Sequence, residues 1–143
     1  MIHELNSPIL GPVIALVIWT IIMLFWMAGA RLPTIKRLKL PDTAGQRTAD
    51  LARQMPAKIQ WSADNYNHLM EQPTLFYAVA LSAALMGMGD GLNLTLAWAY
   101  VGLRVAHSLV HATVNIVLLR FGLFFLSTLA LLWMAINLAL QFV

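Results

Sequence analysis

The sequence predicts an all-α integral membrane protein, a bundle of four transmembrane helices. Of its 143 residues, 60% are hydrophobic and only 10% are charged, whereas soluble domains carry roughly 25% charged residues. The mean hydropathy is +0.74. The charged residues are concentrated between long uncharged segments, each close to the ~20 residues that a helix needs to cross a bilayer. A chain of this length forms a single domain, residues 1–143.

Four apolar segments are the candidate spans, and they cover residues 8–30, 60–89, 92–119 and 121–143. The first is too long for the apolar part of a cleaved signal peptide, and no Lys or Arg precedes it, so we interpret it as a retained helix. The apolar part of the second span begins only at Pro73, which predicts a helix that starts near Lys58 and bends at the proline. A glycine-rich turn precedes the third span, and only a short link separates the third from the fourth.

The link between the first two spans, residues 31–59, holds most of the basic residues. Seven of the nine Lys and Arg residues lie there, namely Arg31, Lys36, Arg37, Lys39, Arg47, Arg53 and Lys58. The positive-inside rule therefore places this loop in the cytoplasm and both termini outside. Because these charges flank a membrane span, the net charge of +3 does not indicate nucleic-acid binding. The chain has no cysteine, which excludes disulfides, thiolate metal ligands and a cysteine nucleophile.

Four polar residues of the third span share one helical face. Arg104, His107, His111 and Asn115 fall within about 80° of arc on a helix. An arginine at the centre of a membrane helix costs about 2.5–3.5 kcal/mol, so we expect this face to meet protein groups or a wet cavity. Interhelical hydrogen bonds in membranes average only about 0.6 kcal/mol, so we favour a functional site over a polar seam that only joins helices.

A metal site is a further interpretation of the two histidines. His107 and His111 are four residues apart, a spacing that points both rings the same way on a helix, and Glu71 is a candidate third ligand. The sequence contains neither a His-Glu-x-x-His pattern nor a cysteine to strengthen this interpretation.

The second helix carries a polar edge before its apolar part begins. Asp64, Asn67 and Glu71 stand at positions i, i+3 and i+7 and therefore lie on one side of a helix. Their carboxylates are suited to neutralise Arg104 or a protonated imidazole. They are equally suited to bind a zwitterionic ligand, for which Asn67 supplies both a donor and an acceptor. The sequence leaves both interpretations open.

These residues together resemble the MAPEG family, the membrane-associated proteins in eicosanoid and glutathione metabolism. The resemblance covers nearly the whole chain, and its local signatures are Asn67-x3-Glu71-x-Pro73, Arg104-x2-His107-x3-His111 and then Arg120. It implies a homotrimer of four-helix subunits in a bacterial inner membrane, with glutathione bound between subunits at the cytoplasmic side. It also implies a lipophilic substrate that approaches from the bilayer.

The resemblance implies a role for each matched residue. Asn67, Glu71 and Arg104 match residues that hold glutathione, and Arg31 matches a basic residue that reaches a neighbouring subunit's site. Arg120 matches the arginine that activates the thiol, because a guanidinium near the sulfur favours the nucleophilic thiolate. This chain departs from better-known members in having Ala63 in place of an arginine and His107 and His111 in place of tyrosines. Glu71 also follows Asn67 by four residues instead of three, and Arg120 lies further beyond His111 than the closing arginine of the family. We expect the two histidines to serve as proton donors.

The function that the resemblance implies is a glutathione-dependent transferase or peroxidase acting on lipophilic electrophiles or lipid hydroperoxides. The alternative is a non-catalytic membrane protein of the same fold that binds a lipid or another amphiphile. A small transporter has little support, because the chain contains no inverted repeat.

Overall fold

The computed structural model describes residues 6–143, and this part of the chain consists of helices joined by turns and loops, with no strand. The elements are α1 (Leu10–Arg37), α2 (Thr48–Gln54), α3 (Ala57–Leu69), α4 (Pro73–Leu85), α5 (Gly91–Thr113) and α6 (Val117–Ala139), with a short 3-10 helix at Leu140–Phe142. The predicted all-helical fold is therefore confirmed for the described residues.

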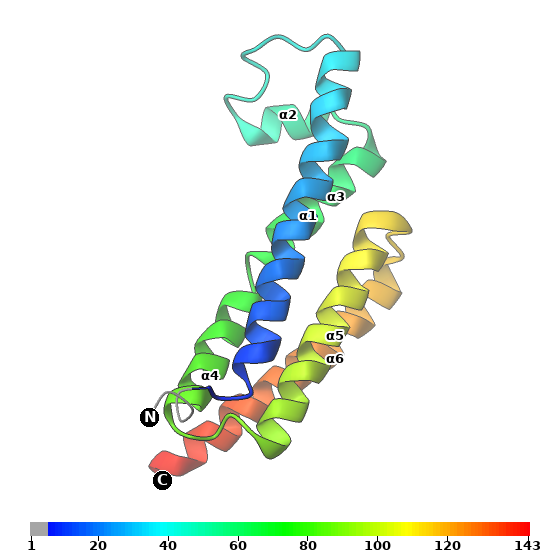
Figure 1. The fold of residues 1–143 in the computed structure, drawn as a ribbon. Helices are drawn as coiled ribbons and strands as arrows, with labels where there is room; N and C mark the ends of the chain where they lie inside the picture. The colour runs from blue at the N-terminus through cyan, green and yellow to red at the C-terminus, as the bar shows by residue number, and fades with distance from the viewer. Residues whose placement is uncertain (1–5) are drawn as a thin grey trace.

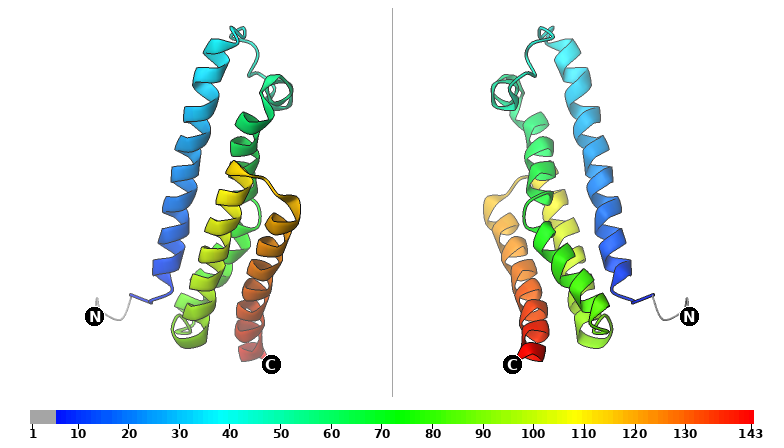
Figure 2. Two further views of the ribbon diagram at one scale, coloured as in Figure 1. Left: turned by 90° about the vertical axis from the view of Figure 1, so that its right-hand side faces the viewer. Right: turned by 90° about the vertical axis from the view of Figure 1, so that its left-hand side faces the viewer.

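The helices form an elongated bundle in which α5 is central. It packs along α6 and also contacts α1 and α3, whereas α4 contacts α1 and α6. Figure 2 shows α1 and α6 on opposite sides of the bundle, and α2 lies across the far end of α1. The start of α1 and the end of α6 lie at the same end of the molecule (Figure 1).

Two segments within residues 6–143 are long and apolar enough to cross a membrane, Leu10–Arg37 and Val117–Phe142. The first, α1, continues past residue 30, where the predicted span ends, to Arg37. Its 28 residues exceed the ~20 that are needed to cross a bilayer. Its last turns, with Lys36 and Arg37, are the start of the predicted basic loop. Together with α2, they make much of that loop helical.

The segment predicted as one bent helix is two helices. Between α3 and α4, the N–H of Met70 donates to the carbonyl of Asn67 at 3.0 Å, and the N–H of Glu71 donates to that of His68 at 3.3 Å. The cause is Pro73, which has no N–H to bond the carbonyl of Leu69 but fits the first turn of a new helix. The proline therefore ends one helix and begins the next instead of bending a single one.

The third predicted span also ends earlier than expected. Helix α5 stops at Thr113, and Asn115 has a left-handed backbone with φ 50°. Its N–H donates to the carbonyl of Val110, five residues earlier, at 2.7 Å, so the chain turns out of the helix at this residue. The prediction that Asn115 continues the polar helical face is wrong, because asparagine tolerates this conformation and closes the helix.

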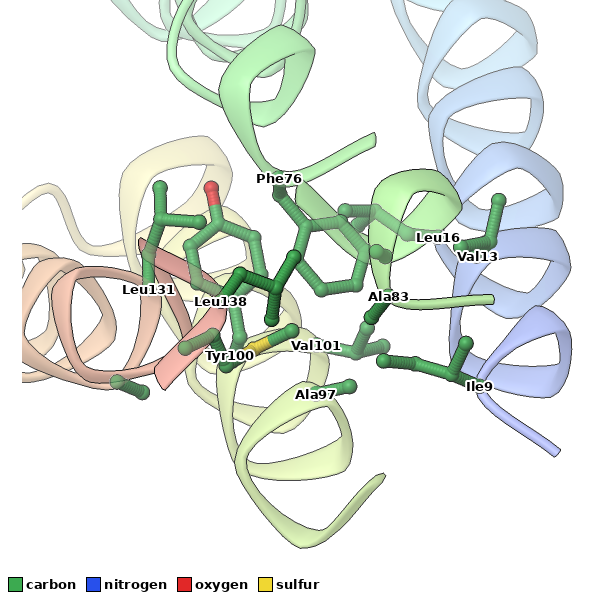
Figure 3. Close-up of a cluster of buried hydrophobic side chains, with 13 residues drawn as sticks. Ile9, Val13, Leu16, Phe76, Ala83, Ala97, Tyr100, Val101, Leu131 and Leu138 are labelled. Carbon is green, nitrogen blue, oxygen red and sulfur yellow. The ribbon is translucent and has the colours of Figure 1, made fainter. Parts of the chain in front are cut away.

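The apolar core joins α1, α4, α5 and α6 (Figure 3). At its centre the rings of Phe76 and Tyr100 are stacked, with centroids 4.5 Å apart and planes within 9°. Arg104 follows Tyr100 by one turn of α5 and is fully buried. The polar face that begins with Arg104 therefore starts where this core ends.

Candidate functional site

Three histidines and an arginine lie together in a group that we call the imidazole cluster (Arg104, His107, His111 and His68). The first three are buried and His68 is half-buried. Helix α5 supplies the first three and α3 the last. The rings of His68 and His107 are stacked with centroids 4.8 Å apart, and His111 meets His107 edge-on at 5.7 Å. The predicted face of α5 thus turns toward α3 and not toward lipid.

A buried hydrogen bond fixes α3 against this face. Nδ2 of Asn65 donates to Oγ of Ser108 at 2.7 Å, and both side chains are almost fully buried. Since a buried polar pair is favourable only when it is matched, this bond sets the register of α3 on α5. It thereby brings His68 opposite Arg104.

Arg104 is held by α3 and α6 but retains free donors. Its Nη2 lies 2.9 Å from Nδ1 of His68 and donates to the His68 carbonyl at 3.3 Å. Its guanidinium carbon lies 5.6 Å from the ring centroid of Phe124, a cation–π contact. Within residues 6–143, however, its Nε and Nη1 are buried without a hydrogen-bond partner, as are Nδ1 of His107 and of His111. The cluster therefore keeps unused hydrogen-bonding capacity.

Arg120 borders a small cavity beside the cluster, which we call the arginine pocket. This cavity has a volume of about 160 Å³ and is lined by His68, His107, Val117, Arg120, Phe121 and Phe124. Arg120 lies in the first turn of α6, and its Nη1 donates to Oδ1 of Asn115 at 2.6 Å. The residue that closes α5 thus also orients this guanidinium.

A larger cavity lies between α1, α2 and α3, and we call it the α1–α3 groove. Its volume is about 470 Å³, and its polar lining includes Arg31, Gln60, Asp64, Tyr66 and Asn67. Nη2 of Arg31 donates to Oε1 of Gln60 at 3.0 Å, and Nε2 of Gln60 donates to Oδ1 of Asp64 at 2.8 Å. Nε of Arg31 is buried and has no partner among the described residues. The groove therefore offers both a basic and an acidic group.

The predicted site residues are distributed over these two cavities. Arg31 and Asn67 line the groove, whereas His107 and Arg120 line the pocket. Arg104 and His111 are buried in the imidazole cluster, and Glu71 is exposed on the turn after α3.

One helical face connects the two cavities. Asp64, Asn67 and His68 stand at i, i+3 and i+4 of α3, and Glu71 follows at i+7 on the adjoining turn. The first two reach the groove and His68 reaches the pocket. Sequence reasoning missed His68, although its spacing from Asp64 puts it on the polar edge that was recognised.

The geometry gives the metal interpretation no support. The described residues include no group of three His, Asp or Glu side chains placed to hold a metal ion. The rings of the predicted ligands His107 and His111 meet edge-on, with centroids 5.7 Å apart. Glu71 lies exposed on the turn.

The MAPEG family model matches residues 9–140, nearly the whole chain. The matched stretch runs from the residue before α1 to the end of α6, and it includes both cavities. No curated protein and no solved structure matches the chain.

Proposed function

Because this chain belongs to the MAPEG family, we propose that it is a glutathione-dependent membrane transferase or peroxidase. Its substrates in this proposal are lipophilic electrophiles or lipid hydroperoxides. The observation that carries the proposal is the α3 face that joins a tripeptide-sized polar groove to a small pocket bordered by Arg120.

The sizes and charges of the two cavities suit different parts of glutathione. Ligand sites usually have volumes of roughly 300–1,000 Å³, so the groove of about 470 Å³ is suited to the peptide part of glutathione. The guanidinium of Arg31, which lines the groove, is a donor for a carboxylate of glutathione, and Asp64 and Glu71 are partners for its amino group. The thiol then extends past Asn67 and His68 into the arginine pocket, which has room for a few atoms only.

The chemistry begins with stabilisation of the thiolate by Arg120. A fixed guanidinium in a water-poor pocket favours the sulfur anion, which is the nucleophile. With an electrophile, a sulfur–carbon bond forms while the bond to the leaving oxygen breaks, and that oxygen takes up a proton. With a hydroperoxide, the sulfur attacks the outer oxygen to form a sulfenic acid, the O–O bond breaks, and the leaving alkoxide takes up a proton to become the alcohol. A second glutathione then converts the sulfenic acid to disulfide and water. His107, which borders the pocket, is the proton donor in this proposal, and His111 lies directly behind it.

Two apolar grooves between α4 and α6 are suited to the lipophilic partner. Their volumes are about 340 and 400 Å³, and they share Ala78, Val79 and Ala135. The first reaches Thr128, one turn of α6 from Phe124 of the arginine pocket. The same grooves favour the second candidate function, a non-catalytic protein that binds a lipid or another amphiphile.

We further propose that the protein is a homotrimer whose subunits cross a bacterial inner membrane four times, through α1, α3–α4, α5 and α6. An even number of crossings agrees with the start of α1 and the end of α6 lying at one end of the bundle (Figure 1). The basic residues at the other end support a cytoplasmic position for residues 31–59 and an outside position for both termini. The membrane lipids around α6 are then the source of the substrate.

The experiment that tests the function is calorimetric titration of the detergent-purified protein with glutathione, with the thiolate absorbance recorded on the same sample. Binding with thiolate formation supports the enzyme. Binding without thiolate means that the pocket does not activate the thiol. No binding at millimolar glutathione favours the amphiphile-binding protein, and co-purified lipids are then analysed.

A further inference from the structure

We propose that His68 donates a hydrogen bond from Nε2 to the thiolate in the arginine pocket, and that Arg104 is the positioning residue that fixes this tautomer. The inference rests on the proposed function, because the thiolate is that of glutathione. It assigns a role to Arg104 that does not require this fully buried side chain to touch the ligand.

The tautomer follows from the contact between the two side chains. Nη2 of Arg104 lies 2.9 Å from Nδ1 of His68, and a guanidinium nitrogen can only donate. Nδ1 must therefore be the acceptor, and the ring carries its hydrogen on Nε2. The second bond of Nη2, to the carbonyl of His68 at 3.3 Å, holds the guanidinium at the end of α3.

The hydrogen-bearing nitrogen is not enclosed by protein. The ring of His68 lines the same cavity as Arg120. Within residues 6–143, Nε2 of His68 has no hydrogen bond and is not among the buried unpaired atoms, in contrast to Nδ1 of His107 and of His111. It is therefore accessible to a ligand in the arginine pocket.

The ring is also held in place by its neighbours. His107 stacks on it with centroids 4.8 Å apart, and Phe124 meets it edge-on at 5.4 Å. A donor that is oriented before the anion arrives costs no reorganisation at the reaction step, which is why such donors are effective. A sulfur anion in this pocket thus receives hydrogen bonds from Arg120 and from His68.

Two substitutions of His68 test the roles of its two ring nitrogens separately. In His68→Asn, the amide oxygen replaces Nδ1 as the acceptor for Arg104, but no donor reaches the pocket. In His68→Gln, the longer amide carries an N–H near the position of Nε2. We expect His68→Asn to form about tenfold less thiolate at pH 7 than the wild type, since a hydrogen bond to a charged group is lost. His68→Gln should stay within about threefold of the wild type, and His68→Asn should weaken glutathione binding by no more than the roughly tenfold factor by which it lowers the thiolate.

The outcomes distinguish this inference from the proposed function. If the wild type forms the thiolate and His68→Asn forms as much, the role of His68 is overturned and the enzyme stands. If the wild type binds no glutathione, the proposed function falls, and the donor role falls with it. A ligand-free measurement tests the tautomer alone, by ¹⁵N NMR of histidine-labelled protein with His68→Gln to assign the signals. We expect a hydrogen-bearing Nε2 and a bare Nδ1, and a hydrogen on Nδ1 would overturn the inference directly.

Discussion

The hydroxyl of Tyr100 donates a hydrogen bond to Oε1 of Gln72 across 3.1 Å, and Nε2 of Gln72 donates to Oγ1 of Thr128 at 2.8 Å. This chain of side chains joins α5, the turn between α3 and α4, and α6. No helix continues through the turn between α3 and α4, and these side-chain bonds connect the turn to α5 and α6. They thereby set the position of Glu71, the residue before Gln72.

We predict that Tyr100→Phe lowers the stability modestly and that Tyr100→Leu lowers it strongly. The phenylalanine keeps the stacking on Phe76 and loses one hydrogen bond, a cost of about 1 kcal/mol. The leucine loses the stacking and leaves a gap as well, a cost of about 3 kcal/mol or more. Thermal unfolding in detergent measures both. Equal melting temperatures for the wild type and Tyr100→Phe would show that the phenol hydroxyl contributes nothing.

Glu71→Gln should weaken glutathione binding without changing the oligomer. The side chain is exposed on its turn, so its loss as a charge partner for the glutathione amino group is worth at most about 1 kcal/mol, or roughly fivefold in affinity. Calorimetry measures the affinity, and size-exclusion chromatography with light scattering measures the oligomer. Asp42→Gln, at an exposed position in the basic loop, is the control for a lost carboxylate. Collapse of the oligomer in Glu71→Gln would instead make this carboxylate structural.

The sequence was sufficient for the helical class, because long uncharged segments and the positions of the basic residues are properties of composition. It was also sufficient to recognise that Arg104 and His107 face protein, since an arginine in a membrane helix is stable only next to polar groups or water. Helix ends were harder to predict. Pro73 is compatible with either a bend or a new helix, and the side-chain bonds of Gln72 that accompany the break come from distant parts of the chain.

The division of the site into a groove and a pocket was not predictable for a related reason. Arg31 and Asn67 line one cavity because α1 packs on α3, and His68 contacts Arg104 because Asn65 bonds Ser108. Sequence spacing gives the neighbours of a residue within its own helix, but not the rotation of one helix against another. His68 could have been included only by extending the polar edge of Asp64, Asn67 and Glu71 to position i+4.

Arg120→Ala should abolish glutathione-dependent turnover while the oligomer stays intact. Removing a preorganised donor to a reacting anion costs about 10²–10³-fold in rate. Turnover with a chromogenic electrophile measures the loss, and size-exclusion chromatography checks the oligomer. Arg53→Ala, which removes an exposed arginine of α2, is the matched control and should keep full activity. Unchanged turnover in Arg120→Ala would remove this residue from the mechanism.

Two substitutions of Asn115 distinguish its two roles, which are to orient Arg120 through its side chain and to adopt the left-handed backbone at the end of α5. Both Asn115→Gly and Asn115→Ala delete the amide oxygen that accepts from Nη1 of Arg120 at 2.6 Å. Only alanine also strains the backbone, because φ is 50° there, and left-handed geometry costs a residue with a Cβ about 1–2 kcal/mol.

We therefore expect both Asn115 variants to lose about tenfold in kcat with KM nearly unchanged, since a guanidinium that is no longer held stabilises the thiolate less well. Only Asn115→Ala should also melt at a lower temperature. Steady-state kinetics and thermal unfolding on the same preparations test both statements. Full activity in Asn115→Gly would show that Arg120 reaches its working position without the amide. A loss confined to Asn115→Ala would then trace the effect to the end of α5 and not to the hydrogen bond.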